Sequence, residues 1–580
     1  MNNIFINLVN SQYCYQGCSP GRFGCQCDQI CGCDTDLYDC IDGPSGTGKC
    51  VCKYGKWEEC GEMNRLNLET NLDSEFQTPC VFSLIKLSKY NHLYSGKFTD
   101  LKFCENTSKT PRYLKGERCN AVHVLPEDTK TELILFNKQA GKHLLLHEND
   151  LFIDQLSGTS PLLKNSEPFA RAYSGHQFGS YSGQLGDGRA ITLGFAADGT
   201  QEISVKGAGR TVFSRAGDGK AVLKNLIREY LGSACLKGLG IPVVEALAVF
   251  ENQDDAIHRD EFYNGDGKMF KSGRLVRVAP SFLRFGSVEF LSDNGDSAGL
   301  VGILQRAVQV VTGVQPTKMM LELSESFNDS VTEKCYFIND SKQLDGVLIH
   351  DVDDTHFTRR LALSYFKFIT ERSAALVAAW QTNGFAHGVM NTDNISLIGL
   401  TIDLNVFGFI TNFNTEFTPN YIDSESRYKF GDQAKRMKWN LQKLADALLK
   451  IFGGPENIEN GRTYDLGYSN VLSKFDDKHQ FCFETRMKQK LGMSDFSNVE
   501  SFLKSTTDKN YHLESSRLSG KTPKYVFSQK RVLAAIEDFM LTGSTDLIEN
   551  VFERLQNPFT GVLDISETVD GNSKTSCGAQ

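Results

Sequence analysis

The sequence lacks long apolar runs and an excess of basic residues. Its most hydrophobic segments, such as residues 301–314, are interrupted by Gln and Arg, whereas a membrane-spanning helix needs about 18 or more consecutive apolar residues. The 580 residues carry a formal net charge of −9, and nucleic-acid-binding proteins usually present a basic face. We therefore expect no transmembrane span and no nucleic-acid partner.

No clear targeting signal and no internal repeat can be recognised in the sequence. The first residues, MNNIFINLVNSQYC, have no basic start and only a short apolar core, and they are not rich in Arg, so neither a secretory signal nor a transit peptide is predicted. What the sequence does have is length and an apolar content of 40%. Such a chain can bury a large core, and its length predicts a globular protein of roughly two to four lobes.

Cysteine is distributed unevenly. Ten of the 17 cysteines lie between residues 14 and 60, in a segment too short to fold without covalent or metal links. Its stretch CIDGPSGTGKCVCKYGKWEEC resembles the second half of an EGF-like or laminin-type repeat, which predicts a disulfide-rich module; a zinc-binding cluster is the alternative. The other seven cysteines look like buried thiols of a reduced protein. The two patterns indicate opposite redox compartments.

Hydrophobic patterning divides the chain into four parts. We expect an EGF-like segment at 1–62, an extension that packs on the core at 63–165, a nucleotide-binding lobe at 166–295 and a helical lobe at 296–580. The fold class is α+β, with the two-lobed layout of a protein kinase: a mixed β/α lobe followed by a mostly helical one.

Strands and helices are predicted from the spacing of apolar residues. In the nucleotide-binding part, AITLGF, EISVK, EALAVF and RLVRV are typical of strands, and residues 221–240 have helical periodicity. The later helices are expected at 359–382, 433–452 and 530–556.

Two glycine-flanked turns are candidates for binding phosphate. In SGQLGDGRA, Gly186 and Gly188 allow backbone amides to approach an anion, and Arg189 adds a fork of donors. A similar turn, AGDGKA, contains Asp218 and Gly219. Either turn alone could be an ordinary hairpin.

A strand lysine and two arginines lie near these turns. Lys206 ends EISVK, and Glu229, 23 residues later, is the acid that could orient it toward a nucleotide. An ordinary surface Lys and a solvated helix Glu are the alternative. Arg277 and Arg284 lie among apolar residues in RLVRVAPSFLRFG. If buried they need partners, either phosphate oxygens or internal carboxylates.

The loop HGVMNTDN, residues 387–394, carries the strongest mechanistic signal. It precedes a strand-like segment, ISLIGLTID, that ends at Asp403. Asn394 and Asp403 supply oxygen ligands of the kind that Mg²⁺ prefers, and Asp393 can accept a proton from an attacking hydroxyl. We expect His387 to be a structural hydrogen-bonding residue.

Four blocks together point to a family: PFARAYSGHQFGSYSGQLGDGRAITLG, SVKGAGRTVFSRAGDGKAVLKNLIREYLGS, VRVAPSFLRFGSVEF and HGVMNTDNISLIGLTID. They closely resemble the selenoprotein O family, protein adenylyltransferases with a kinase-like fold. The resemblance runs with gaps from about residue 91 to the C-terminus, whereas the cysteine-rich N-terminal segment is not part of the family pattern.

The resemblance implies a pseudokinase in name that binds ATP in a flipped orientation. It would transfer AMP to Ser, Thr or Tyr hydroxyls of proteins with loss of pyrophosphate, using Mg²⁺, with Mn²⁺ able to substitute. Lys206 would pair with Glu229, Asp393 would accept the proton, and Asn394 and Asp403 would hold the metal. The implied ATP contacts are Gly186, Asp187, Gly188, Arg189, Lys206, Asp218, Gly219, Arg277, Arg284 and Asp403.

This sequence departs from the family pattern in places. After Asp403 the family usually continues YGPFGFLD, whereas this chain reads LNVFGFIT, without the Gly-Pro pair and with Thr411 in place of an acid. Near the terminus, Cys577 in TSCGAQ lies where eukaryotic members often carry a redox-active Cys or selenocysteine, and it is a redox candidate.

Two other functions remain open from the sequence. One is a true protein kinase that transfers the γ-phosphate; the other is a catalytically impaired nucleotide-binding scaffold, motivated by Thr411 and the N-terminal cysteines. The family resemblance favours mitochondria or cytoplasm, and the cysteine-rich start favours the secretory pathway.

Overall fold

The computed structural model describes most of residues 101–559 and the backbone of four short strands before them. The gaps within that range are 115–118, 145–153, 159–167, 196–200, 262–263, 313–354, 453–464, 508–509, 513–514, 516–522 and 524–526. The four short strands form two hairpins: β1 (Arg22–Phe23) with β2 (Gln29–Ile30), and β3 (Tyr38–Cys40) with β4 (Cys50–Cys52). The cysteine pairing expected at residues 14–60 and Cys577 lie outside the described residues.

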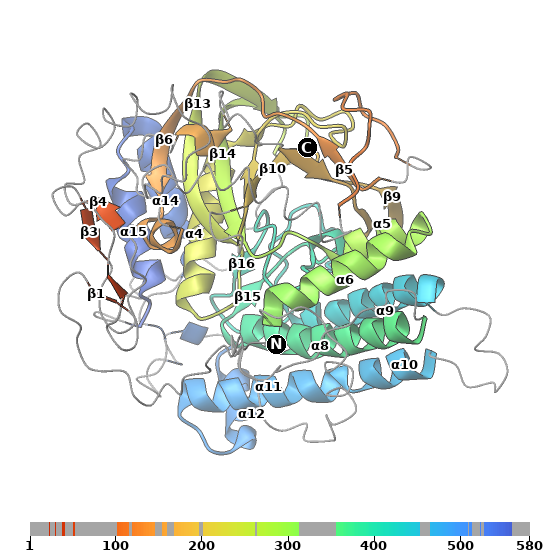
Figure 1. Cartoon of the computed structure of the whole chain (residues 1–580). Coiled ribbons are helices and arrows are strands. Elements are labelled where there is room, and N and C mark those ends of the chain that lie inside the picture. The colour runs from red at the N-terminus through yellow and green to blue at the C-terminus, as the bar shows by residue number, and fades with distance from the viewer. Residues whose placement is uncertain are drawn as a thin grey trace.

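The first half of the described chain is built around an antiparallel sheet (Figure 1). Its strand order is β5-β7-β10-β11-β14-β13-β6, and β12 pairs with β14 at one side. The bounds are β5 Ala121–His123, β6 Thr131–Phe136, β7 Phe169–Arg171, β10 Ala190–Phe195, β11 Glu202–Lys206, β12 Ala221–Val222, β13 Glu245–Arg259 and β14 Lys268–Ala279. All five residues of β11 are buried, as expected for a central strand that is covered on both faces.

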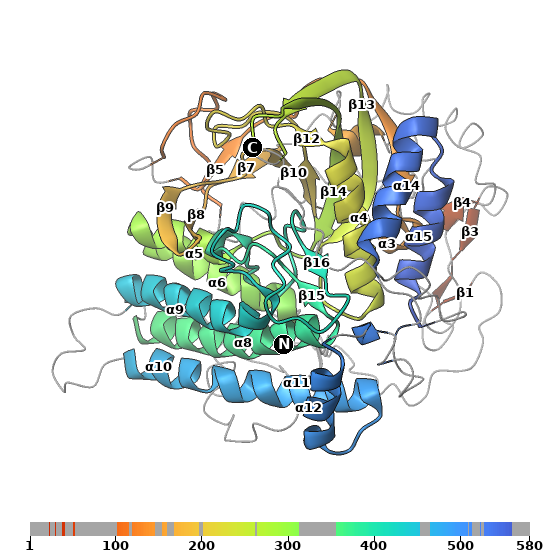
Figure 2. The ribbon, with the colours of Figure 1, turned by 180° about the vertical axis from the view of Figure 1, so that it is seen from behind.

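Helices from distant parts of the sequence cover this sheet. Helix α4 (Leu223–Gly238) packs on β13 and β14, and α14 (Gln529–Thr542) and α15 (Asp546–Gln556) pack on α4 (Figure 2). The short helix α3 (Lys138–His143) contacts β13. The C-terminal helices therefore stabilise the sheet part of the molecule.

The helical part lies below the sheet in Figure 1. Helix α8 (Thr355–Thr382) contacts α6, α9, α10 and α11. Their bounds and those of the two other helices here are α5 Phe285–Asp293, α6 Ser297–Thr312, α9 Gln433–Phe452, α10 Asp465–Ser473, α11 Phe475–Leu491 and α12 Phe496–Ser505. Among the described residues, no helix is both long and apolar enough to cross a membrane. The α+β architecture is confirmed and is consistent with a kinase-like fold.

Two local predictions are wrong. The helix expected at 530–556 is broken, because Gly543 adopts φ +77° and ends α14 as a left-handed C-cap. The segment ISLIGLTID is not a regular strand. It makes only isolated bridges, Ser396 to Arg284 and Thr401 to Val243, and neither partner lies in a strand of the sheet.

The cysteines of the main body also differ from expectation. Cys104 and Cys119 form a buried disulfide, and Cys482 is disulfide-bonded as well. The prediction of ordinary thiols is therefore wrong for these three residues. It is confirmed for Cys235, whose thiol is free and buried, and burial raises its pKa.

A buried lysine in the helical part makes stability depend on pH. Lys490 of α11 donates to the Thr382 carbonyl at 2.7 Å and lies over the Tyr511 ring, and burial lowers its pKa to about 7. Between pH 7 and about 10 the unfolded chain holds a proton that the folded chain has lost, so stability rises with pH in this window.

We expect Lys490→Met to remove this dependence. Relative to wild type, the free energy of unfolding of the variant should be raised most at or below pH 7. This advantage should shrink by about 1 kcal/mol per pH unit up to about pH 10. Urea unfolding at pH 6, 8 and 9 measures it. Lys488→Met on the same helix is the control, and a wild-type minus variant difference that stays constant with pH contradicts the prediction.

Candidate active site

A cavity of about 320 Å³ opens between the sheet and the helical part. Its wall includes the turn at residues 185–190, the ends of β11 and β14, and the loop segments 389–394 and 403–405. The predicted site residues that line it are Gly186, Asp187, Gly188, Arg189, Lys206, Asp218, Gly219, Arg277, Arg284, Asp393, Asn394 and Asp403. Glu229 is not in the wall, because it lies behind Lys206.

Lys206 and Glu229 form a buried ion pair. Lys206 Nζ bonds Glu229 Oε2, and both residues are only 4% exposed. Burial lowers the pKa of Lys206, and the charge of Glu229 opposes this. A second partner is Asn405, whose Oδ1 accepts from Lys206 Nζ at 2.5 Å. The lysine is thus held at the cavity wall by one charged and one neutral acceptor.

Two buried arginines converge on Asp403. Arg277 Nη1 lies 3.2 Å from Asp403 Oδ1, and Arg284 Nη1 bonds Asp403 Oδ2. The sequence left open whether phosphate oxygens or internal carboxylates pair with these arginines, and the structure shows an internal carboxylate, Asp403. Burial alone would raise the pKa of Asp403, but the charges of Arg284, Arg277 and Lys206 outweigh it and hold the pKa well below its usual range. Asp403 is ionised at any physiological pH.

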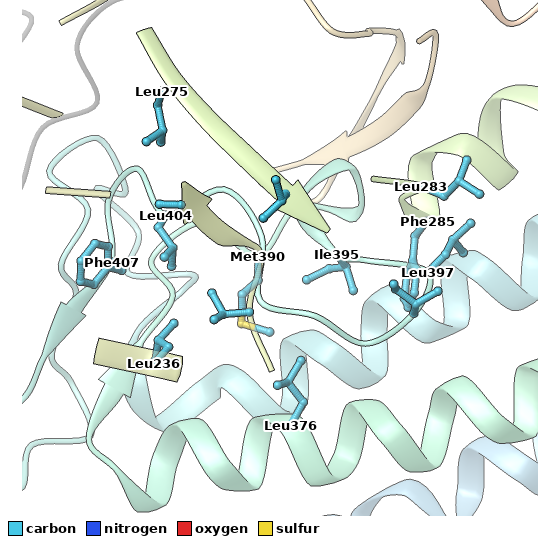
Figure 3. Close-up of a cluster of buried hydrophobic side chains, with 14 of the residues drawn as sticks. Leu236, Leu275, Leu283, Phe285, Leu376, Met390, Ile395, Leu397, Leu404 and Phe407 are labelled. Atoms are coloured by element: carbon cyan, nitrogen blue, oxygen red, sulfur yellow. The ribbon is translucent and has the colours of Figure 1, made fainter. Parts of the chain in front are cut away.

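The loop that contains Asp393 is anchored by apolar side chains. Met390, Ile395 and Leu397 flank it, and they belong to the same buried cluster as Leu404 and Phe407 from the segment after Asp403 (Figure 3). Because interiors are close-packed, such neighbours fix the backbone from which the polar side chains project.

His387 has the structural role that was predicted for it. Its Nε2 donates to the Ile402 carbonyl at 2.9 Å, and its ring lies against Trp380. Burial lowers the pKa of His387 to about 4, so the imidazole is neutral at pH 7. The histidine ties the loop at 387–394 to the residue before Asp403.

Asp393 and Asn394 belong to a short 3-10 turn, Thr392–Asn394, at the cavity. Burial raises the pKa of Asp393 to about 7, against a hydrogen bond from Gln177 and the charge of Arg284, which lower it. Arg284 Nη1 also donates to the Asp393 carbonyl at 2.6 Å, so one guanidinium joins this turn to Asp403.

The donor set fits a magnesium ion. Asn394 Nδ2 donates to the Val389 carbonyl at 3.1 Å, which leaves the amide oxygen to face a ligand, and Asp403 is an ionised carboxylate in the same wall. In the part of the chain that the structure describes, no cluster of three or more His, Cys, Asp or Glu could hold a metal. Mg²⁺ commonly takes one or two protein ligands and completes its shell with phosphate and water.

The two glycine turns approach the cavity closely. Gly186 has φ +149°, and a Cβ there would lie 2.4 Å from the Phe213 ring. Gly219 has φ +74°, and a Cβ there would lie 2.1 Å from the backbone of Gly209. Neither position accommodates a side chain, and both turns line the cavity.

The acids of these turns have structural partners as well. Asp187 Oδ2 accepts from the Arg171 amide at 3.0 Å, and burial raises its pKa. Arg259 Nη2 donates to both carboxylate oxygens of Asp218, at 2.7 and 2.8 Å. Both acids therefore hold the turns in place beside the cavity.

Comparison with known proteins decides the family. Residues 105–536 match the family described as protein adenylyltransferase SelO. The chain belongs to the SelO family of protein adenylyltransferases. This confirms the resemblance drawn from the four sequence blocks, and it makes the protein an enzyme, a protein nucleotidyltransferase.

Three relatives, each named protein nucleotidyltransferase YdiU, illustrate the similarity. The protein of Aromatoleum aromaticum is 36% identical over 412 residues, which cover 69% of either chain. That of Xanthomonas campestris is 35% identical over 383 residues, 65% of this chain and 64% of the relative. That of Azoarcus is 37% identical over 311 residues, 53% of this chain and 52% of the relative. The chain thus spans between about half and about two thirds of these relatives.

Two cavity residues of this SelO family member were not singled out from the sequence. Gln177 bonds Asp393, and Asn405 bonds Lys206. Gln177 lies in the first block that carries the resemblance, and Asn405 stands where the family pattern has the Gly of YGPFGFLD. The departure therefore adds a polar contact at the lysine. Thr411, the other departure, is not among the residues that line the cavity.

Proposed function

We propose that this chain transfers AMP from ATP to Ser, Thr or Tyr hydroxyls of proteins, with release of pyrophosphate and with Mg²⁺ or Mn²⁺ bound. The observation that carries the proposal is a buried carboxylate, Asp393, that lies beside Asn394 and Asp403 in a cavity whose lining includes Lys206 and four arginines. The cations suit a triphosphate, and the carboxylate suits the proton of an incoming hydroxyl.

The proposed roles follow from the chemistry of transfer. The acceptor oxygen forms a bond to the α-phosphorus, the bond from that phosphorus to the bridging oxygen of the β-phosphate breaks, and pyrophosphate leaves with the electron pair. Asp393 takes the hydroxyl proton. Lys206, Arg277, Arg284 and Arg189 bind the phosphate oxygens and stabilise the charge that develops on them. Asn394 and Asp403 would hold the metal, which supplies further charge stabilisation when bound.

The transferred group is tested with two labels. Incubation of the purified chain with α-³²P-ATP and Mg²⁺ should label protein, and γ-³²P-ATP in a parallel reaction should not. Label from γ alone would mean that ATP is bound as in a kinase and that the flipped orientation is wrong. Label from neither, with ATP still bound, would leave only a nucleotide-binding scaffold.

The scaffold is the second candidate because of one contact. Asn405 Oδ1 accepts a hydrogen bond from Lys206 Nζ at 2.5 Å, and a lysine already bonded to an amide has one fewer N–H to donate to phosphate. Under this reading Asn405→Gly, which restores the residue of the family pattern, raises the rate of AMP transfer severalfold.

An oxidising compartment and an EGF-like N-terminal module are the proposed setting. The support is the Cys104–Cys119 disulfide and the disulfide-bonded Cys482, together with the ten cysteines between residues 14 and 60, because disulfides persist mainly outside the reducing cytosol. The proposed setting is tested by counting alkylated thiols in the chain isolated from cells, before and after reduction. Fully reduced cysteines would favour the cytoplasm. Cys577 remains a separate redox candidate.

A further inference from the structure

A separate two-stranded hairpin, which lies between β7 and β10 in the sequence, contacts the loop that carries Asp393. Its strands are β8 (Ser174–Gln177) and β9 (Ser180–Gln184). Three consecutive hairpin residues bond three consecutive loop residues: His176 N donates to Thr392 Oγ1 at 2.7 Å, Gln177 Nε2 to Asp393 Oδ2 at 2.9 Å, and Phe178 N to Asn391 Oδ1 at 3.2 Å. The contacts join segments more than 200 residues apart in sequence.

The turn of this hairpin is fixed by the same contacts. Phe178 and Gly179 both have positive φ, +49° and +91°, as a two-residue type I′ turn requires. A left-handed Phe is uncommon and persists where its surroundings hold it. Here the Phe178 amide also donates to Tyr428 Oη at 3.0 Å, and that hydroxyl donates to Asn391 Oδ1 at 2.6 Å.

The hairpin confines both oxygens of the Asp393 carboxylate. Within the described chain, Gln177 alone donates a side-chain hydrogen bond to it, at Oδ2. Oδ1 is buried without a hydrogen-bond partner in the described structure, and it faces Gly175, where an added Cβ would lie 2.5 Å away. An amide therefore fixes one oxygen, and a glycine backbone limits where the other can move.

We propose that Gln177 is a positioning residue for AMP transfer, because its amide sets the orientation of the Asp393 carboxylate toward the acceptor hydroxyl. The inference rests on the proposed role of Asp393 as proton acceptor. A carboxylate on a short turn can rotate about its side-chain torsions, and misplacement of a reacting group by about 1 Å costs on the order of 100-fold in rate. Gln177 also lines the cavity, so it lies in the same wall as Asp393.

The test compares two glutamines of one hairpin. Gln177→Ala should lower the maximal rate of α-³²P-AMP transfer by about 10- to 100-fold and leave the ATP concentration for half-maximal rate unchanged. Gln184→Ala is the matched control. Gln184 ties the other strand to Leu114 N at 2.6 Å and to the Arg112 carbonyl at 2.9 Å. The Gln184→Ala variant therefore loosens the hairpin without removing a contact to Asp393, and its rate of AMP transfer should stay within about twofold of wild type.

A second variant perturbs the carboxylate from its other side. Gly175→Ala keeps the Gln177 amide but puts a methyl group against Oδ1, so it should also lower the maximal rate and leave ATP half-saturation unchanged. Thermal unfolding of each variant shows that the fold is retained. A purely structural glutamine predicts instead that Gln177→Ala and Gln184→Ala lose equal activity, and that result overturns the inference.

Asp393→Asn separates this inference from the proposed function. If Asp393→Asn transfers AMP at the wild-type rate, the proton-acceptor assignment fails, and the positioning inference fails with it. If Asp393→Asn is inactive while Gln177→Ala keeps the wild-type maximal rate, Asp393 retains its role and only the inference about Gln177 is wrong.

Discussion

Asp403→Asn is expected to lower AMP transfer by about a thousandfold at fixed Mg²⁺ and to raise the Mg²⁺ concentration needed for half-maximal rate. The variant keeps the shape of the side chain but removes the charge that would bind the metal, and a metal at a transferring phosphate stabilises the transition state by several kcal/mol, or roughly a thousandfold in rate. Titration of the α-³²P-AMP transfer rate with Mg²⁺ measures both effects.

Asparagine is the informative replacement because Asp403 has a second role. Its two oxygens are bonded by Arg277 and Arg284, which are 3% and 4% exposed. Both replacements remove the charge that compensates the two guanidiniums, and breaking a buried ion pair from one side costs about 3–5 kcal/mol. Asparagine at least fills the same volume and keeps one oxygen that can accept from a guanidinium, whereas alanine also leaves a cavity. A loss of activity in the alanine variant would therefore mix metal loss with a larger loss of stability.

Asn394→Ala provides the matched control for Asp403. It removes the other proposed ligand and only one neutral hydrogen bond, from Nδ2 to the Val389 carbonyl, and it leaves the two arginines paired. Both variants should need more Mg²⁺ than wild type. If Asp403→Asn is impaired at every Mg²⁺ concentration and Asn394→Ala is not impaired at all, the metal-ligand assignment is wrong and Asp403 acts only through the arginines.

Local elements were predictable where one pattern decided them. AITLGF and EISVK coincide with β10 and β11, and residues 433–452 coincide with α9, because strand and helix periodicities are properties of adjacent residues. The break at Gly543 was also local, and the apolar pattern that runs through it concealed it. ISLIGLTID has strand-like composition, but pairing depends on an available edge, which composition does not reveal.

The site was predictable as a set of residue types but not as a set of contacts. The glycines, acids and cations of the four blocks line one cavity, and their residue types indicated phosphate and metal chemistry. That Asp403 pairs with two arginines, and that Gln177 lies on Asp393 across 216 positions of sequence, depends on how the sheet and the helical part pack together. The Cys104–Cys119 disulfide was missed for the same reason, since scattered cysteines give no sign of their distance in space.

Lys206→Met is expected to lower the rate of AMP transfer strongly and also to destabilise the fold. Removal of a donor aimed at developing phosphate charge costs roughly 100- to 1000-fold in rate. The substitution also leaves Glu229, 4% exposed, without its ammonium partner, which costs about 3–5 kcal/mol of unfolding free energy. Rates with α-³²P-ATP and urea unfolding at pH 7 measure the two effects separately. Lys237→Met is the control, because its pair with Glu245 is exposed and such pairs contribute about 1 kcal/mol or less.

The double variant Lys206→Met with Glu229→Gln separates stability from catalysis. A neutral amide beside the methionine no longer leaves a buried charge uncompensated, so much of the lost stability should return, although Arg277 Nη1, 3.6 Å from Glu229 Oε1, then loses part of its compensation. Activity should not return, because neither replacement supplies an ammonium group at the cavity wall. If the double variant recovers AMP transfer together with stability, Lys206 has only a structural role, and the phosphate charge must be met by Arg189, Arg277 and Arg284 alone.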